Sequence, residues 1–385
     1  MSLFSKLYGT PEVIGVDIGS HSIKVVELIE SRQGLQLRKA GSRATPPDAT
    51  KAGVISNTTA IADALNALLQ ALEIDTASVV AGVAGPTVVV RQVQLPAMSE
   101  RQLRKSIQWE ARNYVSFPVE DSVLEFQILD PAAGSAQMEV MLVATPRDMV
   151  DSRVEALELA GLDPIAVEIE PFAAMRSLIE FNPDPALDNE TIALVGLGAT
   201  FTDINIVKHR KFVLTRMIPI AGNSMTEAVA SALSMDHEKA NALKETAMQV
   251  VTAEEERATL DPFAQQASRA VEPLLDELIR EIRRSLAYYD YQQQAPAESE
   301  QSAGVNRIML YGGSAKMAGL ARYLQLNLGV PVEAADIFAD GRLQTPGLSQ
   351  EYLKEHAPSL MVGTGLALRE LMVSGRMRVR AGETS

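Results

Sequence analysis

Short apolar runs separated by small and polar residues organise the first part of the chain. Residues 13–16 and 25–28 are mostly apolar, and the eight residues between them, 17–24, are mostly small or polar. The same arrangement returns at residues 192–207 in the second half. Runs of this length on both sides of a tight turn predict two strand–turn–strand units, one in each half of the chain.

Apolar residues spaced three and four positions apart predict helices between these units. They occur in residues 60–72, and Ser99 is placed to cap a helix over residues 100–114. A helix over residues 147–160 ends at Gly161, a residue type that favours the position after a helix. Further strands are predicted at 79–84, 88–90, 124–129, 139–144 and 307–311, and further helices within 253–294 and at 359–372. The alternation predicts an α/β fold.

Composition narrows the class of protein. A length of 385 residues predicts two or more domains, and the formal net charge of −14 argues against broad nucleic-acid binding and against docking on anionic lipid by charge alone. The chain has no cysteine, which excludes disulfides, and its four histidines show no metal-ligand spacing. No run approaches the roughly 20 apolar residues that span a bilayer, and residues 1–10 lack the features of a secretory signal.

Three glycine-containing turns carry the candidate chemistry. Residues 17–24 and 196–203 connect the paired apolar runs, and residues 312–315 follow a predicted strand and precede a helix. Small residues in a tight turn leave backbone N–H groups free to face an anion, and serine or threonine hydroxyls add donors. Two such hairpins, one in each half, predict a clamp that grips the phosphates of a nucleotide from opposite sides.

The order of these turns resembles that of the actin-like ATPase superfamily, which includes FtsA, MreB and the heat-shock chaperone ATPases. Within it, the whole chain is similar to the PilM family of type IV pilus assembly. Besides the turns, the resemblance rests on motifs at residues 109–111, 114–118, 159–162 and 357–369. These motifs span nearly the full length, and the last of them is the most specific.

The resemblance implies an actin-like ATPase fold of the α/β class, with two domains around a nucleotide cleft and an FtsA-type inserted α+β subdomain. The expected inserted subdomain covers residues 92–165, and the second domain covers residues 191–339. The first domain is expected to combine residues 1–91, 166–190 and 340–385.

The resemblance also assigns roles within the turns for ATP or ADP with Mg²⁺. Asp17 and Asp203 are the expected metal-binding residues, and Glu170 occupies the place where the superfamily positions the attacking water. The nucleotide-binding residues fall into three groups: Gly19, Ser20, Ser22 and Lys24 at the phosphates, Gly198, Ala199 and Thr200 on their other side, and Gly312, Gly313 and Ser314 with Lys244 at the adenosine.

Two positions depart from the family pattern. Gly196 stands where the second hairpin normally begins with an aspartate, and Asn241 stands where many relatives have a glutamate that contacts the ribose. Loss of a metal-ordering carboxylate lowers the rate of hydrolysis by about 10²- to 10³-fold. The resemblance therefore implies a protein that binds ATP and hydrolyses it very slowly or not at all.

The implied function is that of a cytoplasmic adaptor at the inner face of the inner membrane. Such a protein binds the cytoplasmic N-terminal tail of the membrane protein PilN and links the motor to the pilus assembly platform, without a membrane segment of its own. The tail is expected in a groove beside the inserted subdomain, whose first helix carries Trp109 and Tyr114. A homo-oligomer is left open, and no nucleic-acid partner is expected.

Two alternatives stay open at this point: a division protein like FtsA and a small-molecule kinase of the same superfamily. A division protein like FtsA usually ends in a basic amphipathic helix, which this sequence does not show, and Gly196 counts against a kinase.

Trp109 is expected in a core more often than on a partner surface. Glu168 and Glu170, two residues apart, would share the face of a strand, and that face is expected to be solvated.

Overall fold

The computed structural model describes residues 12–31, 34–130, 136–293 and 304–373. Its first sheet has five strands in the order β10-β6-β1-β2-β3. They are β1 (Val13–Ile18), β2 (Ser22–Ser31), β3 (Gly34–Ala44), β6 (Ser78–Val83) and β10 (Asp163–Ile169). β1 pairs antiparallel with β2 and parallel with β6, so the first predicted hairpin forms the middle of this sheet.

The second sheet repeats this plan in the order β13-β12-β11-β14-β15. Its strands are β11 (Thr191–Leu197), β12 (Thr202–Lys208), β13 (Lys211–Ile218), β14 (Arg307–Tyr311) and β15 (Val332–Ala334). β11 pairs antiparallel with β12 and parallel with β14, as β1 does with β2 and β6. Both hairpins that the sequence predicted are confirmed, and each lies at the same place in its sheet.

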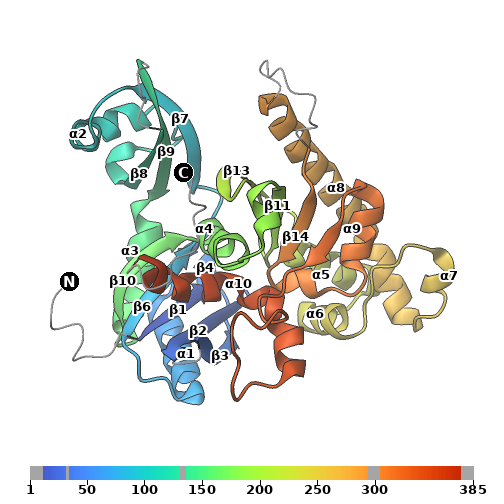
Figure 1. Ribbon diagram of the computed structural model, residues 1–385. Helices are drawn as coiled ribbons and strands as arrows, with labels where there is room; N and C mark the ends of the chain where they lie inside the picture. Colours follow the sequence, from blue (N-terminus) through green and yellow to red (C-terminus); the bar gives the residue numbers. More distant parts are fainter. Residues whose placement is uncertain (1–11, 32–33, 131–135, 294–303, 374–385) are drawn as a thin grey trace.

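Helices cover the sheets and join them (Figure 1). The first sheet is accompanied by α1 (Thr58–Leu72), α3 (Arg147–Leu159), α4 (Glu170–Met175) and α10 (Gln350–Val373). The second is accompanied by α5 (Gly222–Leu233), α6 (His237–Thr246), α7 (Glu254–Arg257), α8 (Pro262–Gln293) and α9 (Leu320–Leu328). The predicted segment 253–294 is thus divided between α7 and α8.

α10 lies against β1, β2 and α4, and small residues permit the close approach. A Cβ atom on Gly365 would lie 1.8 Å from the carbonyl oxygen of Ala173 in α4, and one on Gly15 would lie 2.1 Å from the carbonyl oxygen of Gly363. The apolar cluster around α10 contains residues of both sheets, including Val26 and Leu194. This shared core positions the two hairpin turns relative to each other.

A third sheet forms a separate small subdomain, which stands away from the two larger sheets in Figure 1. It contains β7 (Val89–Pro96), β9 (Gln137–Pro146) and β8 (Ser122–Asp130) in that order, with α2 (Glu100–Ala111) packed on one face. The predicted cap is confirmed, since Ser99 and Gln102 form a reciprocal capping box. Leu103 and Ile107 of α2 pack into the core of this subdomain.

The boundaries of this subdomain differ from those expected. Its first strand begins at Val89 rather than near residue 92, and its last strand ends at Pro146 rather than near residue 165. Residues 147–165 belong with the first sheet, because α3 packs against α1 and β10 pairs parallel with β6. The expected boundary followed the chain past the last strand of the subdomain into elements that pack elsewhere.

The expectation of a buried Trp109 is wrong. Its side chain is 70% exposed, because the residues of α2 that face the sheet are Leu103, Ile107 and Ala111. Among the described residues, no helix has the length and apolar character to cross a membrane.

Candidate functional site

The first turn joins β1 to β2 and carries a buried ion pair. Asp17, 6% exposed, lies opposite Lys24 in the antiparallel register, and Lys24 Nζ lies 3.0 Å from Asp17 Oδ2. The backbone N–H of Gly19 donates to the carbonyl oxygen of Ser22 at 3.2 Å and closes the turn. Within the described residues, the hydroxyls of Ser20 and Ser22 have no hydrogen-bond partner, so both are available to a ligand.

Thr45, which the sequence analysis did not select, holds this turn in place. Its hydroxyl donates to the carbonyl oxygen of Gly19 at 2.6 Å, and its backbone N–H donates to that of His21 at 2.9 Å. Thr45 follows the last residue of β3, so the turn is braced from the neighbouring strand. No motif in the sequence marks this role.

The second turn collects the other predicted binding residues around Gly198. Its carbonyl oxygen accepts from the backbone N–H of Gly222 at 3.0 Å and from Ser314 Oγ at 3.1 Å. Its N–H donates to the carbonyl oxygen of Phe201 at 3.1 Å. The third predicted turn and the start of α5 therefore both meet the second turn.

The remaining predicted binding residues of the second and third turns differ in how far they are bonded within the protein. The carbonyl oxygen of Ala199 accepts from Asn223 N at 2.8 Å, whereas Thr200 is half-buried with its hydroxyl unbonded among the described residues. Gly312 has a φ of +92° and lies so close to Leu197 that a Cβ atom would be 2.6 Å from its carbonyl oxygen, which requires glycine there. Gly313 faces open space.

Lys244 lies inside the second domain rather than free in the cleft. It is 8% exposed, and its Nζ donates to the carbonyl oxygen of Gly222 at 3.1 Å and to Thr226 Oγ1 at 2.7 Å. Burial is the main cause that lowers its pKa, and Glu245 opposes that effect. Lys244 thus fixes the first turn of α5 against α6. Asn241 bonds Glu245 Oε1 from the same helix at 3.1 Å.

The space above Gly196 is filled by the carboxyl group of Asp203. The two residues are register partners, and a Cβ atom on Gly196 would lie 2.3 Å from Asp203 Oδ1 and 2.5 Å from Cζ of Tyr311. Asn205 Nδ2 donates to Asp203 Oδ2 at 2.5 Å, and the Tyr311 hydroxyl also donates to it. Burial raises the pKa of Asp203 to about 6, against the effect of these hydrogen bonds.

Glu170 is the first residue of α4 and lies near both hairpins. Burial is the main cause that raises its pKa to about 8, and the negative charge of Asp17 adds to it while Arg153 and Lys24 oppose it. Asp203 is near enough to contribute as well. The predicted catalytic carboxylate is therefore within electrostatic reach of both predicted metal-binding carboxylates.

The expectation of a solvated face at Glu168 and Glu170 is wrong. Glu168 receives two hydrogen bonds from the guanidinium of Arg176, at 2.5 Å and 2.6 Å, and both side chains are largely buried. Arg176 also donates to the carbonyl oxygen of Gly365 at 2.9 Å. The pair ties β10 to α10, while Glu170 at the start of α4 faces the site.

Arg153 of α3 is a buried cation beside this group, and the sequence analysis missed it. It is 2% exposed and donates to three carbonyl oxygens: Gly82 at 2.7 Å, Gly53 at 2.5 Å and Met149 at 3.0 Å. Burial lowers its pKa, and Glu170 and Asp17 oppose that effect. Its positive charge partly balances the carboxylates of the site.

One contact crosses between the two domains at the first turn. His21 Nε2 lies 3.6 Å from Glu245 Oε1 of α6. Burial is the main cause that lowers the pKa of His21; Glu245 opposes it, and the charges of Lys244, Lys24 and Lys316 lower it further. Three lysines therefore lie near the first turn.

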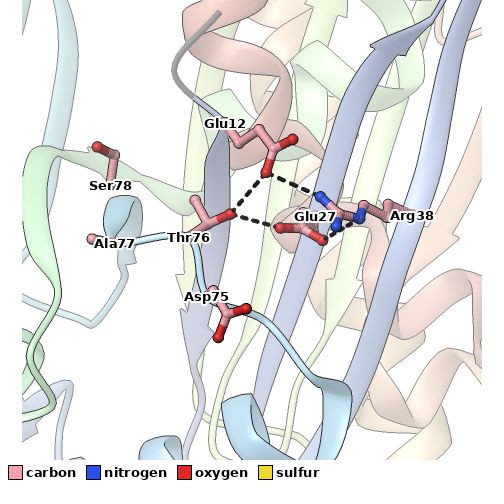
Figure 2. Close-up of a pocket in the computed structure, with 7 residues that line it drawn as sticks. All are labelled: Glu12, Glu27, Arg38, Asp75, Thr76, Ala77 and Ser78. Carbon is pink, nitrogen blue, oxygen red and sulfur yellow. Dashed lines mark hydrogen bonds and ion pairs between the residues drawn. The ribbon is translucent and has the colours of Figure 1, made fainter. Parts of the chain in front are cut away.

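Two cavities lie away from this site. One, of about 310 Å³, is at the opposite end of β1 from Asp17, where Glu12 and the buried Glu27 meet Arg38 and Thr76 (Figure 2). Thr76 Oγ1 donates to Glu27 Oε1 at 2.7 Å, and Arg38 bonds Glu12 at 3.0 Å. The other, of about 510 Å³, lies beside Val250, Gly319 and Arg322 in the second domain. Their polar groups are largely paired within the protein.

Comparison with known proteins identifies the family. A family model described as "Type IV pilus assembly protein PilM" matches residues 15–371. The chain belongs to the PilM family of type IV pilus assembly proteins. Its fold is that of the actin-like ATPases, and the match favours the pilus branch over the division-protein and kinase alternatives.

Solved structures agree with this assignment. A "PilM-PilN type IV pilus biogenesis complex" is similar at a TM-score of 0.78 and 28% identity, covering 93% of this chain and 98% of that one. The ethanolamine utilization protein EutJ from Carboxydothermus hydrogenoformans has the same fold at a TM-score of 0.54 and 15% identity, with 94% and 90% of the two chains covered. The first likeness extends over nearly the whole PilM-type chain.

Proposed function

We propose that this PilM-family protein is a nucleotide-binding adaptor that binds the N-terminal tail of a PilN-type membrane protein. In this role it stays in the cytoplasm, at the inner face of the inner membrane, and links the motor to the pilus assembly platform. The observation that carries the proposal is the match over residues 15–371, together with the similarity to a PilM–PilN complex.

Features of the first and third turns support nucleotide binding. The hydroxyls of Ser20 and Ser22 are free among the described residues, Lys24 lies beside them, and Gly313 opens onto free space. Bound ATP with Mg²⁺ would supply negative charge that spans the gap between the domains. Mg²⁺ favours a few carboxylates together with phosphates and water, and Asp17 is the carboxylate placed for this.

The metal part of the site is less complete than the phosphate part. Asp17 is paired with Lys24, and Asp203 is bonded to Tyr311 and Asn205. No group of three potential metal-ligating acidic, histidine or cysteine side chains occurs within the described ranges. Metal binding at Asp17 therefore requires Lys24 to turn from the carboxylate to a phosphate, which Lys24 is long enough to contact.

Slow hydrolysis follows from the same residues. With a pKa of about 8, Glu170 is largely protonated at neutral pH and is a poor acceptor for the proton of an attacking water. Gly196 provides no carboxylate, and the nearby Asp203 is held by two donors. We infer a very slow ATPase at most, and steady turnover near one per second would contradict this part of the proposal.

The junction between the small subdomain and the first domain is the site we propose for the tail. Half-buried apolar side chains gather there around the buried Met149 and Ile169, and they come from both parts of the chain: Val54, Val88, Val90, Val143, Val167 and Phe172. An extended or helical apolar segment that covers these side chains would remove their exposed apolar surface from water. Tyr114, three residues after the end of α2, is half-buried against the core of the small subdomain.

Calorimetric titration tests both parts of the proposal. ATP–Mg²⁺ is titrated into the protein, and a synthetic PilN-type N-terminal tail is then titrated with and without the nucleotide. We expect micromolar binding of each ligand. Tail binding without any ATP binding would reduce the protein to a structural scaffold, and ATP binding without tail binding would contradict the adaptor role.

Neighbouring valines of β7 provide a matched pair for the tail site. Val90 belongs to the junction, whereas Val89 projects from the opposite face of the strand. Val90→Asp is expected to weaken tail binding at least about tenfold, because it places a charge in an apolar contact. Val89→Asp is expected to change it little. Equal affinities for the two variants would place the tail elsewhere.

A further inference from the structure

The outward face of α2 has a composition unlike the rest of this acidic chain. At 100° per residue, Gln108, Arg101, Arg112, Lys105 and Trp109 fall within an arc of about 100° opposite the buried residues of the helix. All five are exposed, and none is acidic. We call this set the α2 face. It carries three formal positive charges on a protein whose net charge is −14.

The charges at the middle of this face are not used within the protein. In the part of the chain that the structure describes, Arg101 and Lys105 have no ion-pair partner. Arg112 is bonded to Glu120 at 2.7 Å, at the end of the helix. Lysine and arginine side chains that point into solvent without partners are available to an external anion.

Trp109 adds an aromatic group to this cationic surface. It is 70% exposed, and the guanidinium of Arg112 lies 5.2 Å from its ring centre. Tryptophan beside lysine and arginine is typical of protein surfaces that settle at the headgroup level of a bilayer, where the ring is buried while its N–H stays hydrated.

We propose that the α2 face docks on the anionic headgroup surface of a membrane. The net charge of −14 does not oppose this at short range, because charges beyond about 8 Å are screened at physiological ionic strength. The attraction comes from the residues that touch the membrane surface, and each lysine or arginine among them raises the partition coefficient about fivefold.

This inference rests on the proposed function, because the α2 face alone binds weakly. Three basic residues and one tryptophan amount to a marginal surface contact, comparable to other single membrane signals that need a second anchor. A tail bound at the junction of the small subdomain supplies that anchor by raising the local concentration of the face near the bilayer. The α2 face would then fix the rotation of the adaptor on the membrane.

Trp109 reports the contact directly, because it is the only tryptophan of the chain. The full-length protein is mixed with vesicles that display a lipid-anchored PilN-type tail, made either of phosphatidylcholine or of phosphatidylcholine and phosphatidylglycerol in equal parts. Sedimentation measures binding through the tail. The emission of Trp109, with quenching by brominated lipid, measures insertion of the α2 face. We expect sedimentation with both vesicles, but a blue shift and quenching only with the anionic ones.

Charge reversal provides the matched variants. Arg101→Glu with Lys105→Glu is expected to abolish quenching and to lower binding to anionic vesicles without the tail at least about tenfold. Arg280→Glu with Arg284→Glu reverses two exposed arginines at the same spacing on α8 and is expected to keep both signals. Equal thermal midpoints of the variants show that each is folded.

Three results would overturn the inference. One is sedimentation through the tail with no change in Trp109 emission on anionic vesicles. Another is equal loss of quenching in the α2 and α8 variants. The third is a shift of Trp109 emission by the soluble tail alone, which would assign the α2 face to the tail or to another protein segment. Failure to sediment on tail-bearing vesicles would contradict the adaptor function instead, while binding to tail-free anionic vesicles still tests the face.

Discussion

The two hairpin turns occupy equivalent places in their sheets but hold their carboxylates differently. Asp17 is the register partner of Lys24, and Gly196 is the register partner of Asp203. Each cross-strand pair therefore contains one carboxylate, on the incoming strand in the first hairpin and on the outgoing strand in the second. In the first, the partner is a cation; in the second, the partner is a glycine.

The difference lies in which strand supplies the carboxyl group and in what that group is bonded to. The glycine leaves room for the Asp203 carboxyl group, and Tyr311 of the neighbouring strand β14 supplies a hydrogen bond where Lys24 supplies a charge in the first hairpin. A lysine that neutralises a carboxylate can leave it and contact a phosphate instead. A carboxylate bonded by buried neutral donors keeps those hydrogen bonds.

The sharpest way to break this comparison is to restore the aspartate that the family pattern predicts. Gly196→Asp is expected to lower the free energy of unfolding by about 4 kcal/mol, because the new side chain overlaps Asp203 and Tyr311 and adds a like charge. Urea denaturation measures this loss. A change below about 1 kcal/mol would show that the space above Gly196 is not filled as described.

The double variant Gly196→Asp with Asp203→Gly moves the carboxylate to the incoming strand, as in the first hairpin. It is expected to recover more than half of the stability lost by Gly196→Asp alone. This non-additivity is the signature of two residues that share one space. If the double variant were less stable than the single one, the two positions would be independent.

The first hairpin is tested by removal of its cation. Lys24→Met leaves the carboxylate of Asp17, 6% exposed, without its ion pair and is expected to lower the free energy of unfolding by about 3 kcal/mol. Lys39→Met is the control, since Lys39 pairs with the exposed Glu73 at 3.4 Å and such surface pairs contribute at most about 1 kcal/mol. Similar losses for both variants would mean that the Asp17–Lys24 pair is solvated.

The sequence predicted the parts of the fold that local pattern determines. The two hairpins and the Ser99 cap follow from apolar runs, turn residues and capping chemistry within a few positions of each other, and all are confirmed. The predicted boundary near residue 165 includes α3 and β10, which follow the subdomain in the chain but pack against α1 and β6. Packing partners distant in sequence leave no mark in a local pattern.

The candidate site shows the same division. The glycines and Asp17 could be selected from turn chemistry, and Tyr311 could have been selected because it ends the strand before Gly312. Arg153 could not, since it is one arginine on an amphipathic helix, and its three carbonyl partners come from three separate segments. Trp109 was placed in the core by residue type, whereas the spacing of Leu103, Ile107 and Ala111 puts it on the outer face.

The smallest expected effect sharpens the comparison at Asp203. Tyr311→Phe removes one donor and is expected to lower the free energy of unfolding by about 1 kcal/mol at neutral pH.

The effect of this substitution should depend on pH. Burial already raises the pKa of Asp203 to about 6, above its unfolded value, so the folded state loses stability as the carboxyl group ionises with rising pH. The tyrosine opposes this rise, and the variant should therefore have a still higher pKa. Because the unfolded pKa is the same in both proteins, the difference in stability should be smallest well below pH 6 and should grow as pH rises through about 6. Urea denaturation from pH 4 to pH 8 measures it, and a difference that does not vary with pH would show that Tyr311 does not bond the ionised carboxylate.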